Sequence, residues 1–316
     1  MKTLKEFDTV DRWLQFVLGE GIKSEATEKT YLHFLVRYCR FAHKTPDELI
    51  AERRLQLKSK DEIEERKHEE LLRDWRAKIE KDGLSRGTAI TAHNAVKSFY
   101  KANYVPLLSK SPKHWKTRVK KVPTREELAR IIKVARNTRD KAIIMCLAQT
   151  GTSLTDFVDI FTIDKIRAEF NRDVEPVHVH MRRHKTGSEP YDTFLGADAI
   201  ECLKAYLGEK LPNNKNPVFA EAKRTVQFIV EKVSRRAALS PSPTGQTHVT
   251  PHGLRAFFST SMTLSFTRES SHTKHIALVD YWMGHVLPYG GAYMVPPIES
   301  QRELYKAHEE AVSIKL

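Results

Sequence analysis

A short basic segment, residues 110–122, divides this chain into two parts of different character. It reads KSPKHWKTRVKKV, contains no acidic residue, has Pro112 near its start and is followed directly by Pro123. Proline and closely spaced positive charges disfavour a packed element and are typical of an extended connection between folded units. A chain of 316 residues is also longer than one small hydrophobic core usually needs. We therefore expect one domain at residues 1–109, a basic linker at 110–122 and a second domain at 123–316.

The first part of the chain has the spacing of amphipathic helices. Residues 9–18, 27–43 and 86–103 repeat apolar side chains every three or four positions, as the buried face of a helix requires. Residues 46–81 are highly charged and almost free of glycine and proline, which favours one or two exposed helices. No strand pattern interrupts these segments. We therefore expect the first domain to be all-α.

The second part combines helices with one pair of strands. Thr124 precedes Glu127 by three residues, the spacing of a capping box, and the apolar run KAIIMCLAQT stops at Gly151, a residue that commonly ends helices. Residues 176–195 alternate apolar and polar side chains around a central KTG, which predicts a β-hairpin with every second residue facing the core. Helical patterns return toward the C-terminus. The expected fold class is mainly α with a small β-hairpin or sheet, an all-α domain followed by an α+β domain.

The net charge of +13 narrows the class of partner. A strongly basic protein most often binds a polyanion, and nucleic acid is a more frequent partner than an acidic membrane surface. The linker alone has the charge density to follow a phosphate backbone, and Trp115 lies among its charges. A solubilising surface charge and a solvated tether are the alternative interpretations of these two features.

Several other classes of protein are disfavoured by the same sequence. The chain has 3 cysteines and no CxxC pair, which fits reduced, buried thiols better than disulfides or a structural zinc site. The pairs His248/His252 and His272/His275 have metal-ligand spacing, but no acid or cysteine completes either one. We expect no metal. No apolar run approaches 18 residues and no apolar targeting segment begins the chain, so we expect no membrane association and a cytoplasmic location.

Two late motifs carry the most specific signal. The stretch TPHGLRAFFSTSM contains His252, Leu254 and Arg255, and YWMGHVLPYGGAYMVPP contains His285 and Tyr293. An HxLR, a GH about thirty residues later and a tyrosine eight residues after that histidine resemble the tyrosine recombinase (phage integrase) family. The resemblance covers about residues 124–300, and the GGAYMVPP ending looks closest to the archaeal branch of the family.

This resemblance implies a set of site residues. The family's roles fall on Tyr293 as the nucleophile, Arg255 as a phosphate-binding arginine, His252 and His285 as site histidines, Lys185 as the hairpin lysine, and Asp156 as a supporting acid. Tyr289 and Tyr305 compete with Tyr293. Tyr289 lies only four residues after His285, and Tyr305 sits in a run patterned as a packed helix.

The chemistry of the family explains why these residue types recur. Attack of a tyrosine hydroxyl on a phosphodiester builds negative charge on the non-bridging oxygens, and guanidinium groups bind that charge while staying protonated. Imidazoles add hydrogen bonds and move protons, and a lysine supplies the proton that the leaving 5′ oxygen needs. The product is a covalent 3′-phosphotyrosine that conserves the bond energy, so resealing requires no cofactor.

One position departs from the family pattern. The first family arginine normally stands in a TGLR-like motif with an acid three residues later, whereas this chain reads TGTSLTD and places Ser153 at the arginine position. A catalytically silent relative, an engineered or inactivating change, and replacement by another arginine all explain this departure. On a strand, residues i and i+2 share a face, so Arg183 starts from the same face as Lys185, and Arg182 from the opposite one. Arg183 is therefore our candidate for the missing charge.

The leading functional interpretation is a site-specific DNA recombinase or integrase that inserts or excises a mobile element in a prokaryotic nucleoid or in a viral or plasmid context. The resemblance implies double-stranded DNA as partner and four protomers assembled on two sites. A catalytically silent DNA-binding relative and a type IB topoisomerase-like activity are the alternatives. The C-terminal run 299–313 is expected to be a helix that packs on a neighbouring subunit or on its own domain. Linker residues expected to contact DNA are Lys113, Lys116, Arg118, Lys120 and Lys121.

Overall fold

The computed structural model describes residues 4–19, 25–110, 119–183, 189–269, 273–287 and 295–315. Contacts within the chain divide it into two compact units, Met1–Lys116 and Thr117–Leu316. Most of the expected linker, residues 111–118, lies outside the described residues. Within those residues, no helix is both long enough and apolar enough to cross a bilayer.

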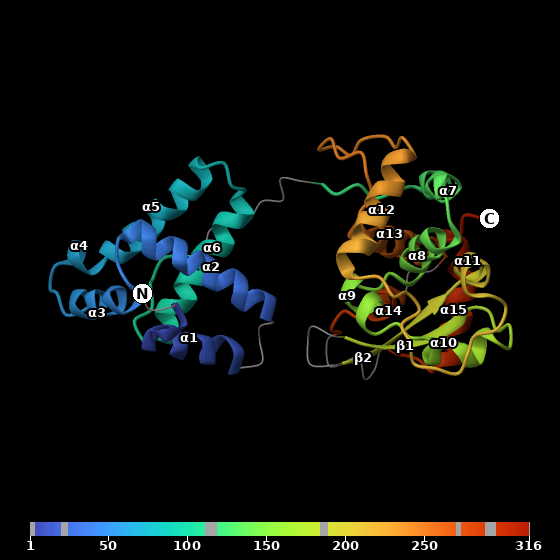
Figure 1. Ribbon diagram of the computed structural model, residues 1–316, viewed down its shortest axis with the longest axis horizontal. Coiled ribbons are helices and arrows are strands. Elements are labelled where there is room, and N and C mark those ends of the chain that lie inside the picture. Colours follow the sequence, from blue (N-terminus) through green and yellow to red (C-terminus); the bar gives the residue numbers. More distant parts are fainter. Residues whose placement is uncertain are drawn as a thin grey trace. The chain divides into compact units, whose positions relative to one another are not determined.

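The first unit contains helices and no strand among its described residues (Figure 1). Helix α6 is central, because it contacts α1, α2 and α5. The indole Nε1 of Trp13 in α1 donates a hydrogen bond to Ser98 Oγ of α6 at 2.9 Å, and its ring meets Phe99 edge-on at 5.6 Å. The elements of this unit are η1 (Leu4–Glu6), α1 (Asp8–Gly19), α2 (Glu25–Ala42), α3 (Pro46–Gln56), α4 (Glu62–Glu65), α5 (Lys67–Lys81) and α6 (Arg86–Ala102).

The charged stretch 46–81 differs from the expectation of exposed helices. It forms α3, α4 and α5, and the longer two bury one face each: Leu49 and Ile50 of α3 and Leu72 and Trp75 of α5 are at most 3% exposed. A few apolar residues at helical spacing are enough to bury one face while charges cover the other. The high charge of this stretch therefore hid its amphipathic pattern.

The second unit is built around α8, whose residues Ala142–Thr150 are all buried. Helices α11 and α13 and strand β2 pack on α8, and β2 pairs antiparallel with β1. Figure 1 shows this hairpin beside α10 and α15. The elements are α7 (Arg125–Val134), α8 (Thr138–Thr150), α9 (Leu154–Asp159), α10 (Ile163–Phe170), β1 (Val177–Arg182), β2 (Pro190–Leu195), α11 (Ala197–Leu207), α12 (Lys223–Arg236), α13 (Pro251–Glu269), α14 (Thr273–Trp282), α15 (Ile298–His308) and η3 (Glu309–Ala311).

Local sequence signals correspond to local structure in this unit. Thr124 Oγ1 accepts from the Glu127 amide at 3.2 Å, and Glu127 Oε2 accepts from the Thr124 amide at 3.1 Å, which completes the expected capping box. Gly151 ends α8 in the left-handed conformation, with φ 60°. Every second residue of β1 is buried, from Val177 to Met181. The expected fold class, mainly α with a small hairpin, is confirmed.

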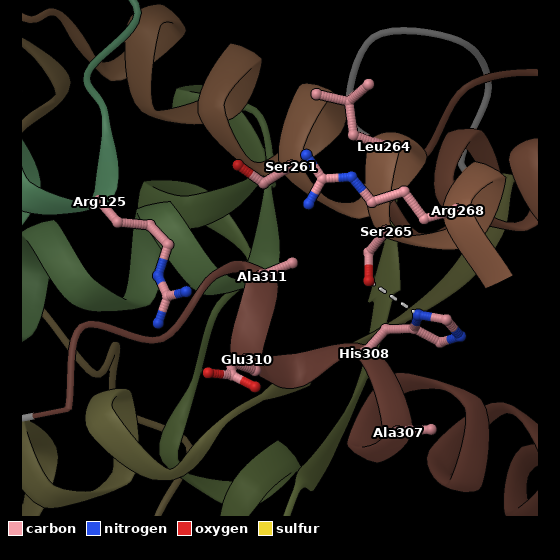
Figure 2. A pocket seen from close by; sticks show the side chains of 9 residues that line it. All are labelled: Arg125, Ser261, Leu264, Ser265, Arg268, Ala307, His308, Glu310 and Ala311. Atoms are coloured by element: carbon pink, nitrogen blue, oxygen red, sulfur yellow. Dashed lines mark hydrogen bonds between the residues drawn. The ribbon is translucent and has the colours of Figure 1, made fainter.

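The expected C-terminal helix is present and packs on its own unit. Tyr305 of α15 is fully buried, and its hydroxyl donates to the carbonyl oxygen of Gln149 in α8 at 2.9 Å. A cavity of about 450 Å³ separates the C-terminal half of α13 from the end of α15, and Figure 2 shows Ser265 pointing across to His308, to which it is hydrogen-bonded at 2.9 Å. Tyr305 is therefore a core residue and not a candidate nucleophile.

Candidate active site

Arg255 lies one turn inside the start of α13, and the local sequence fixes that start. Thr250 Oγ1 accepts from the Gly253 amide at 3.2 Å, and Pro251 occupies the first turn, where a missing N–H costs nothing. A Cβ atom on Gly253 would lie 2.5 Å from the carbonyl oxygen of Lys121, so this position has room only for glycine. Leu254 is fully buried. Within the HGLR motif, Gly253 allows the close approach of Lys121 and Leu254 is buried in the core. The start of α13 is therefore fixed in place, and Arg255 is directed into the site.

The guanidinium of Arg255 is held mainly by backbone carbonyls. Its Nη1 donates to Gly151 O at 2.6 Å and to Met283 O at 2.8 Å, and its Nη2 lies 2.7 Å from Nε2 of His285. These contacts use three of its five N–H groups. The Nε–H and the second Nη2–H have no partner among the described residues. Arg255 thus presents an open edge, defined by these two donors on neighbouring nitrogens, and guanidinium donors of this kind bind phosphate or carboxylate oxygens.

His285 is oriented by the end of α14. Gly284 has φ 72°, its amide donates to Tyr281 O at 2.7 Å, and the His285 amide donates to Asp280 O at 2.9 Å. This pair of hydrogen bonds is a Schellman motif, which places His285 directly after the helix. A Cβ on Gly284 would also lie 2.9 Å from the ring of Tyr191. The GH motif is therefore a helix stop that delivers a histidine to the site.

Asp280 sets the tautomer of His285. Its Oδ1 lies 2.8 Å from His285 Nδ1, and an ionised carboxylate can only accept, so Nδ1 carries a proton. Arg255 can only donate, so Nε2 of the same ring accepts from it. The three side chains form a directed chain from the carboxylate of Asp280 through the imidazole to the guanidinium. Sequence analysis missed Asp280, because an acid near the end of a helix carries no signal of this role.

Ser153 occupies a helix cap instead of an arginine site. It is the N-cap of α9, and its Oγ accepts from the Asp156 amide at 3.1 Å. Asp156 is 3% exposed, and its Oδ2 accepts from the Tyr191 hydroxyl of β2 at 3.2 Å. Burial raises the pKa of Tyr191, and the negative charge of Asp156 raises it further. Tyr191 was not singled out from the sequence, and it links the hairpin to α9 beside Gly284.

Arg183 shares the electrostatic surroundings of Arg255. It follows β1, is half-buried, and its amide donates to Glu189 O at 2.9 Å across the hairpin. Burial lowers the pKa of Arg255, the negative charge of Asp156 opposes this effect, and the positive charge of Arg183 lowers the pKa further. Arg182 acts elsewhere, because it contributes to the lowered pKa of Lys165 in α10, whose main cause is burial. The two neighbouring arginines therefore act on different groups: Arg183 on Arg255 and Arg182 on Lys165.

Apart from Lys121, the remaining predicted residues fall into two groups. Tyr293, Tyr289 and Lys185 lie outside the described residues, as do Lys113, Lys116 and Arg118 of the basic segment. His252 is exposed in the first turn of α13, and Lys120 is exposed before α7. No group of three or more metal-ligating side chains occurs in the parts of the chain that the structure describes.

Lys121 requires a correction. We expected it to contact DNA together with its neighbours, but its side chain is 9% exposed and its Nζ lies 2.7 Å from Glu127 Oε1. Its backbone carbonyl also lies against Gly253 at the start of α13. The residue has a structural role because a buried ammonium group needs a paired carboxylate. The second unit therefore begins before the end of the expected linker.

Comparisons with known proteins identify the fold. No family profile matches the sequence, and no curated protein matches it significantly. Among solved structures, a lambda integrase dimer bound to a core site has a TM-score of 0.56 and 16% identity, covering 88% of this chain and 93% of that one. A lambda integrase tetramer bound to a Holliday junction gives 0.55 and 15%, covering 93% and 76%. The recombinase XerH bound to its difH substrate gives 0.51 and 20%, covering 87% and 77%. The chain therefore has the fold of tyrosine recombinases.

Proposed function

We propose that this protein is a site-specific DNA recombinase that cleaves and rejoins DNA through a 3′-phosphotyrosine on Tyr293. The observation that carries the proposal is the open edge of Arg255. Its guanidinium is fixed by Gly151 O, Met283 O and His285 Nε2, and it keeps two adjacent N–H donors for an incoming anion. A donor pair held in place before substrate arrives is what stabilises the charge of a phosphoryl transition state.

The neighbouring side chains supply the rest of the chemistry. His285 is held as the Nδ1–H tautomer by Asp280 and strengthens the orientation of Arg255. Arg183 supplies the second positive charge in place of the arginine that Ser153 replaces. Lys185 donates the proton to the leaving 5′ oxygen, and His252 contacts the phosphate from the first turn of α13. Attack by Tyr293 forms the tyrosyl ester and releases the 5′ hydroxyl, and the reverse step reseals the strand.

The wider assignment follows from the fold and the charge. The solved structures with this fold include complexes with DNA, one of them a tetramer on a Holliday junction. We propose double-stranded DNA as the partner, a homotetramer on two sites as the active assembly, and integration or excision of a mobile element as the outcome. The basic residues of the segment 110–120 contact DNA phosphates, and the setting is cytoplasmic. Binding should weaken steeply with salt, because the contacts are mainly to phosphates.

A covalent adduct is the direct test. A binding site is first selected from a pool of random duplexes, and a nicked duplex carrying that site is then incubated with the protein. We expect a protein–DNA adduct that survives denaturant, and its loss in Tyr293→Phe. A wild-type protein that binds the selected site but never forms the adduct would overturn the proposal. An adduct that persists in Tyr293→Phe would show that another tyrosine is the nucleophile. Relaxation of a supercoiled plasmid without joining of two sites would point to a topoisomerase-like activity.

A second candidate function is a silent DNA-binding protein on the same fold. The capping role of Ser153 favours it, because the position of a family arginine is used here to stabilise a helix. A silent relative would bind the selected duplex with the same salt dependence and give no adduct. The Arg183→Ala variant would then change binding alone.

A further inference from the structure

A cavity of about 410 Å³ in the first unit belongs to no role described above. It lies between α5, the middle of α6 and the segment that follows α6, and its lining includes Glu69, His93 and Ser109. Its volume falls in the range of roughly 300–1,000 Å³ that is usual for small-molecule sites. All of these lining residues belong to one unit, so the cavity does not depend on how the two units are arranged.

Three residues that line the cavity carry buried polar atoms that lack partners. Both ring nitrogens of His93, Oε2 of Glu69 and Oγ of Ser109 are buried and have no hydrogen-bond partner within the described part of this unit. His93 is only 2% exposed. A buried polar atom without a partner costs about 1–3 kcal/mol, and native proteins keep few of them. Three such residues around a single cavity indicate a place that a polar ligand completes.

The unpartnered groups are held rigidly. The other carboxylate oxygen of Glu69, Oε1, accepts from Arg53 Nη2 at 2.8 Å and from the Leu108 amide at 3.1 Å. Lys97 Nζ donates to the carbonyl oxygen of Ser109. These bonds fasten the segment 106–109 to α5 and α6. The wall is therefore formed before any ligand binds, which reduces the entropic cost of binding.

The wall chemistry selects a ligand with N–H donors. Burial lowers the pKa of His93 to about 4, helped by the charges of Arg76 and Lys97, so the ring is neutral near pH 7 and offers one donor and one acceptor. Ser109 offers one of each, and Glu69 Oε2 only accepts. A phosphate or carboxylate brings acceptors alone and would leave Glu69 unsatisfied. The hydrogen-bonding edge of a nucleobase brings donors and acceptors side by side.

The rim of the cavity favours a negatively charged group. Arg66, Arg73, Arg76 and Lys110 line it, and of these Arg73 lies 3.4 Å from Glu70. Arg66 and Arg76 have no acidic partner among residues 4–19 and 25–110, the described part of this unit. Guanidinium groups bind phosphate oxygens and also stack on the planes of bases. Cations at the rim and hydrogen-bond donors and acceptors inside match the two ends of one nucleotide.

We propose that this cavity binds a nucleotide, with its base against His93, Glu69 and Ser109 and its phosphate on the arginine rim. The same chemistry is offered by an unpaired nucleotide of a DNA strand and by a free mononucleotide. The proposal goes beyond strand cleavage, because it concerns a site in the other unit and requires no covalent step.

Binding to the full-length chain tests the proposal without any cleavage assay. Ligand-observed NMR measures whether the cavity binds a free mononucleotide. The probes are the four nucleoside 5′-monophosphates, the matching nucleosides and inorganic phosphate. Competition by a short paired duplex and by the same duplex with a single bulged nucleotide measures the DNA source. We expect at least one monophosphate to bind, its nucleoside about tenfold more weakly, and the bulged duplex to compete better than the paired one.

Two variants separate the wall from the rim. His93→Phe keeps the ring volume but removes both unpartnered nitrogens, so we expect an unchanged or higher melting temperature and binding of nucleotide and nucleoside weakened at least tenfold. Arg76→Gln should weaken the monophosphate about tenfold and leave the nucleoside unchanged. Lys78→Gln, on the same helix and paired with Asp82 at 3.2 Å, is the matched control and should change neither.

Each result decides between the two sources or overturns the site. Binding of free monophosphates that His93→Phe abolishes supports a mononucleotide ligand, and a His93-dependent preference for the bulged duplex alone supports an unpaired DNA nucleotide. Failure of every nucleotide and of the bulged duplex to bind leaves only water for the cavity and overturns the proposal. Equal binding of inorganic phosphate and monophosphates, unaffected by His93→Phe, overturns it as well.

Discussion

Ser153 Oγ accepts a hydrogen bond of 3.1 Å from the backbone amide of Asp156, and this bond caps α9. An arginine side chain has no acceptor and cannot make the same bond. The stability of this helix start and a positive charge at this position therefore exclude one another. The chain has kept the cap, and a further guanidinium that acts on Arg255 is that of Arg183, directly after β1.

The capping role predicts a specific stability change. Ser153→Ala should lower the free energy of unfolding of the second unit by about 1 kcal/mol, because the Asp156 amide loses its acceptor. Ser153→Asp should retain most of that stability, since a carboxylate caps as well as a hydroxyl. Thr162→Ala at the start of α10 is the control, because the Thr162 hydroxyl donates to Asp164 at 2.6 Å but caps no backbone amide. Urea unfolding of the three variants measures the difference, and equal losses at both sites would contradict the capping role.

Replacement of Arg183 should separate cleavage from binding. Arg183→Ala is expected to lower the rate of adduct formation about 100-fold or more, as loss of a preorganised donor to a developing charge does, and to weaken DNA binding only slightly. Arg182→Ala is the control, because Arg182 acts on Lys165 and not on Arg255. Single-turnover cleavage and equilibrium binding are measured for both variants. Equal losses of rate and affinity in Arg183→Ala would reduce Arg183 to a backbone contact.

A second arginine variant tests whether an arginine at position 153 and Arg183 can place a positive charge at the same point of the site. Ser153→Arg introduced into the Arg183→Ala protein should recover part of the lost cleavage rate, at the expense of the α9 cap. The same change in the wild-type protein should give no gain in rate, because Arg183 already supplies the charge. No recovery in the double variant, with its fold intact by circular dichroism, would speak against Arg183 as the substitute.

Asp280 is expected to act through His285. Asp280→Ala removes the carboxylate that fixes the Nδ1–H tautomer and should slow cleavage by at least about tenfold, less than the roughly 100-fold or more that a group transferring the proton itself contributes. His285→Ala and the double variant complete a cycle. If the carboxylate acts through the imidazole, the double variant should be no slower than His285→Ala alone. Fully additive losses would show that Asp280 contributes independently.

Asp192 predicts a pH dependence of stability. Burial by itself raises the pKa of Asp192, but hydrogen bonds from His178, Tyr281 and His180 outweigh it and lower the pKa to about 2 from an ordinary value of 3.8. Because the folded-state pKa is the lower one, the stabilisation is complete above about pH 4 and is lost as the pH falls toward 2. It amounts to about 2 kcal/mol, since each pKa unit corresponds to about 1.4 kcal/mol.

The Asp192→Asn variant isolates this contribution. It should be less stable than the wild type by about 2 kcal/mol between pH 5 and 7, with a difference that shrinks below pH 4, because the wild type then loses the same charge. Urea unfolding at a series of pH values gives the comparison. Asp164→Asn, a change to an acid that accepts from Thr162 at the start of α10, serves as the control. A difference that stays constant down to pH 3 would rule out the ionised Asp192 as its source.

Sequence patterns predicted the features that depend on residues close together in the chain. The Thr124 capping box, the glycine stop at Gly151 and the alternating face of β1 all arise from hydrogen bonds or burial within a few residues, and the structure confirms each one. The motif HGLR and the later GH also located Arg255 and His285, because the start of one helix and the end of another are local events. The burial of the charged stretch 46–81 was predicted less well, because charged residues outnumber the few apolar residues that form its buried faces.

The composition of the site was decided by tertiary structure. Arg255 donates to Gly151 across 104 positions of sequence, Tyr191 donates to Asp156 across 35, and Lys121 is buried against Glu127 by the approach of Gly253. None of these contacts leaves a periodic or compositional trace, because they depend on which faces meet when α8, α13 and the hairpin pack. The sequence alone therefore determined the elements and the motif residues. Only packing decided which donors of Arg255 stay open, that Ser153 caps a helix, and that His93 borders a cavity with its nitrogens unsatisfied.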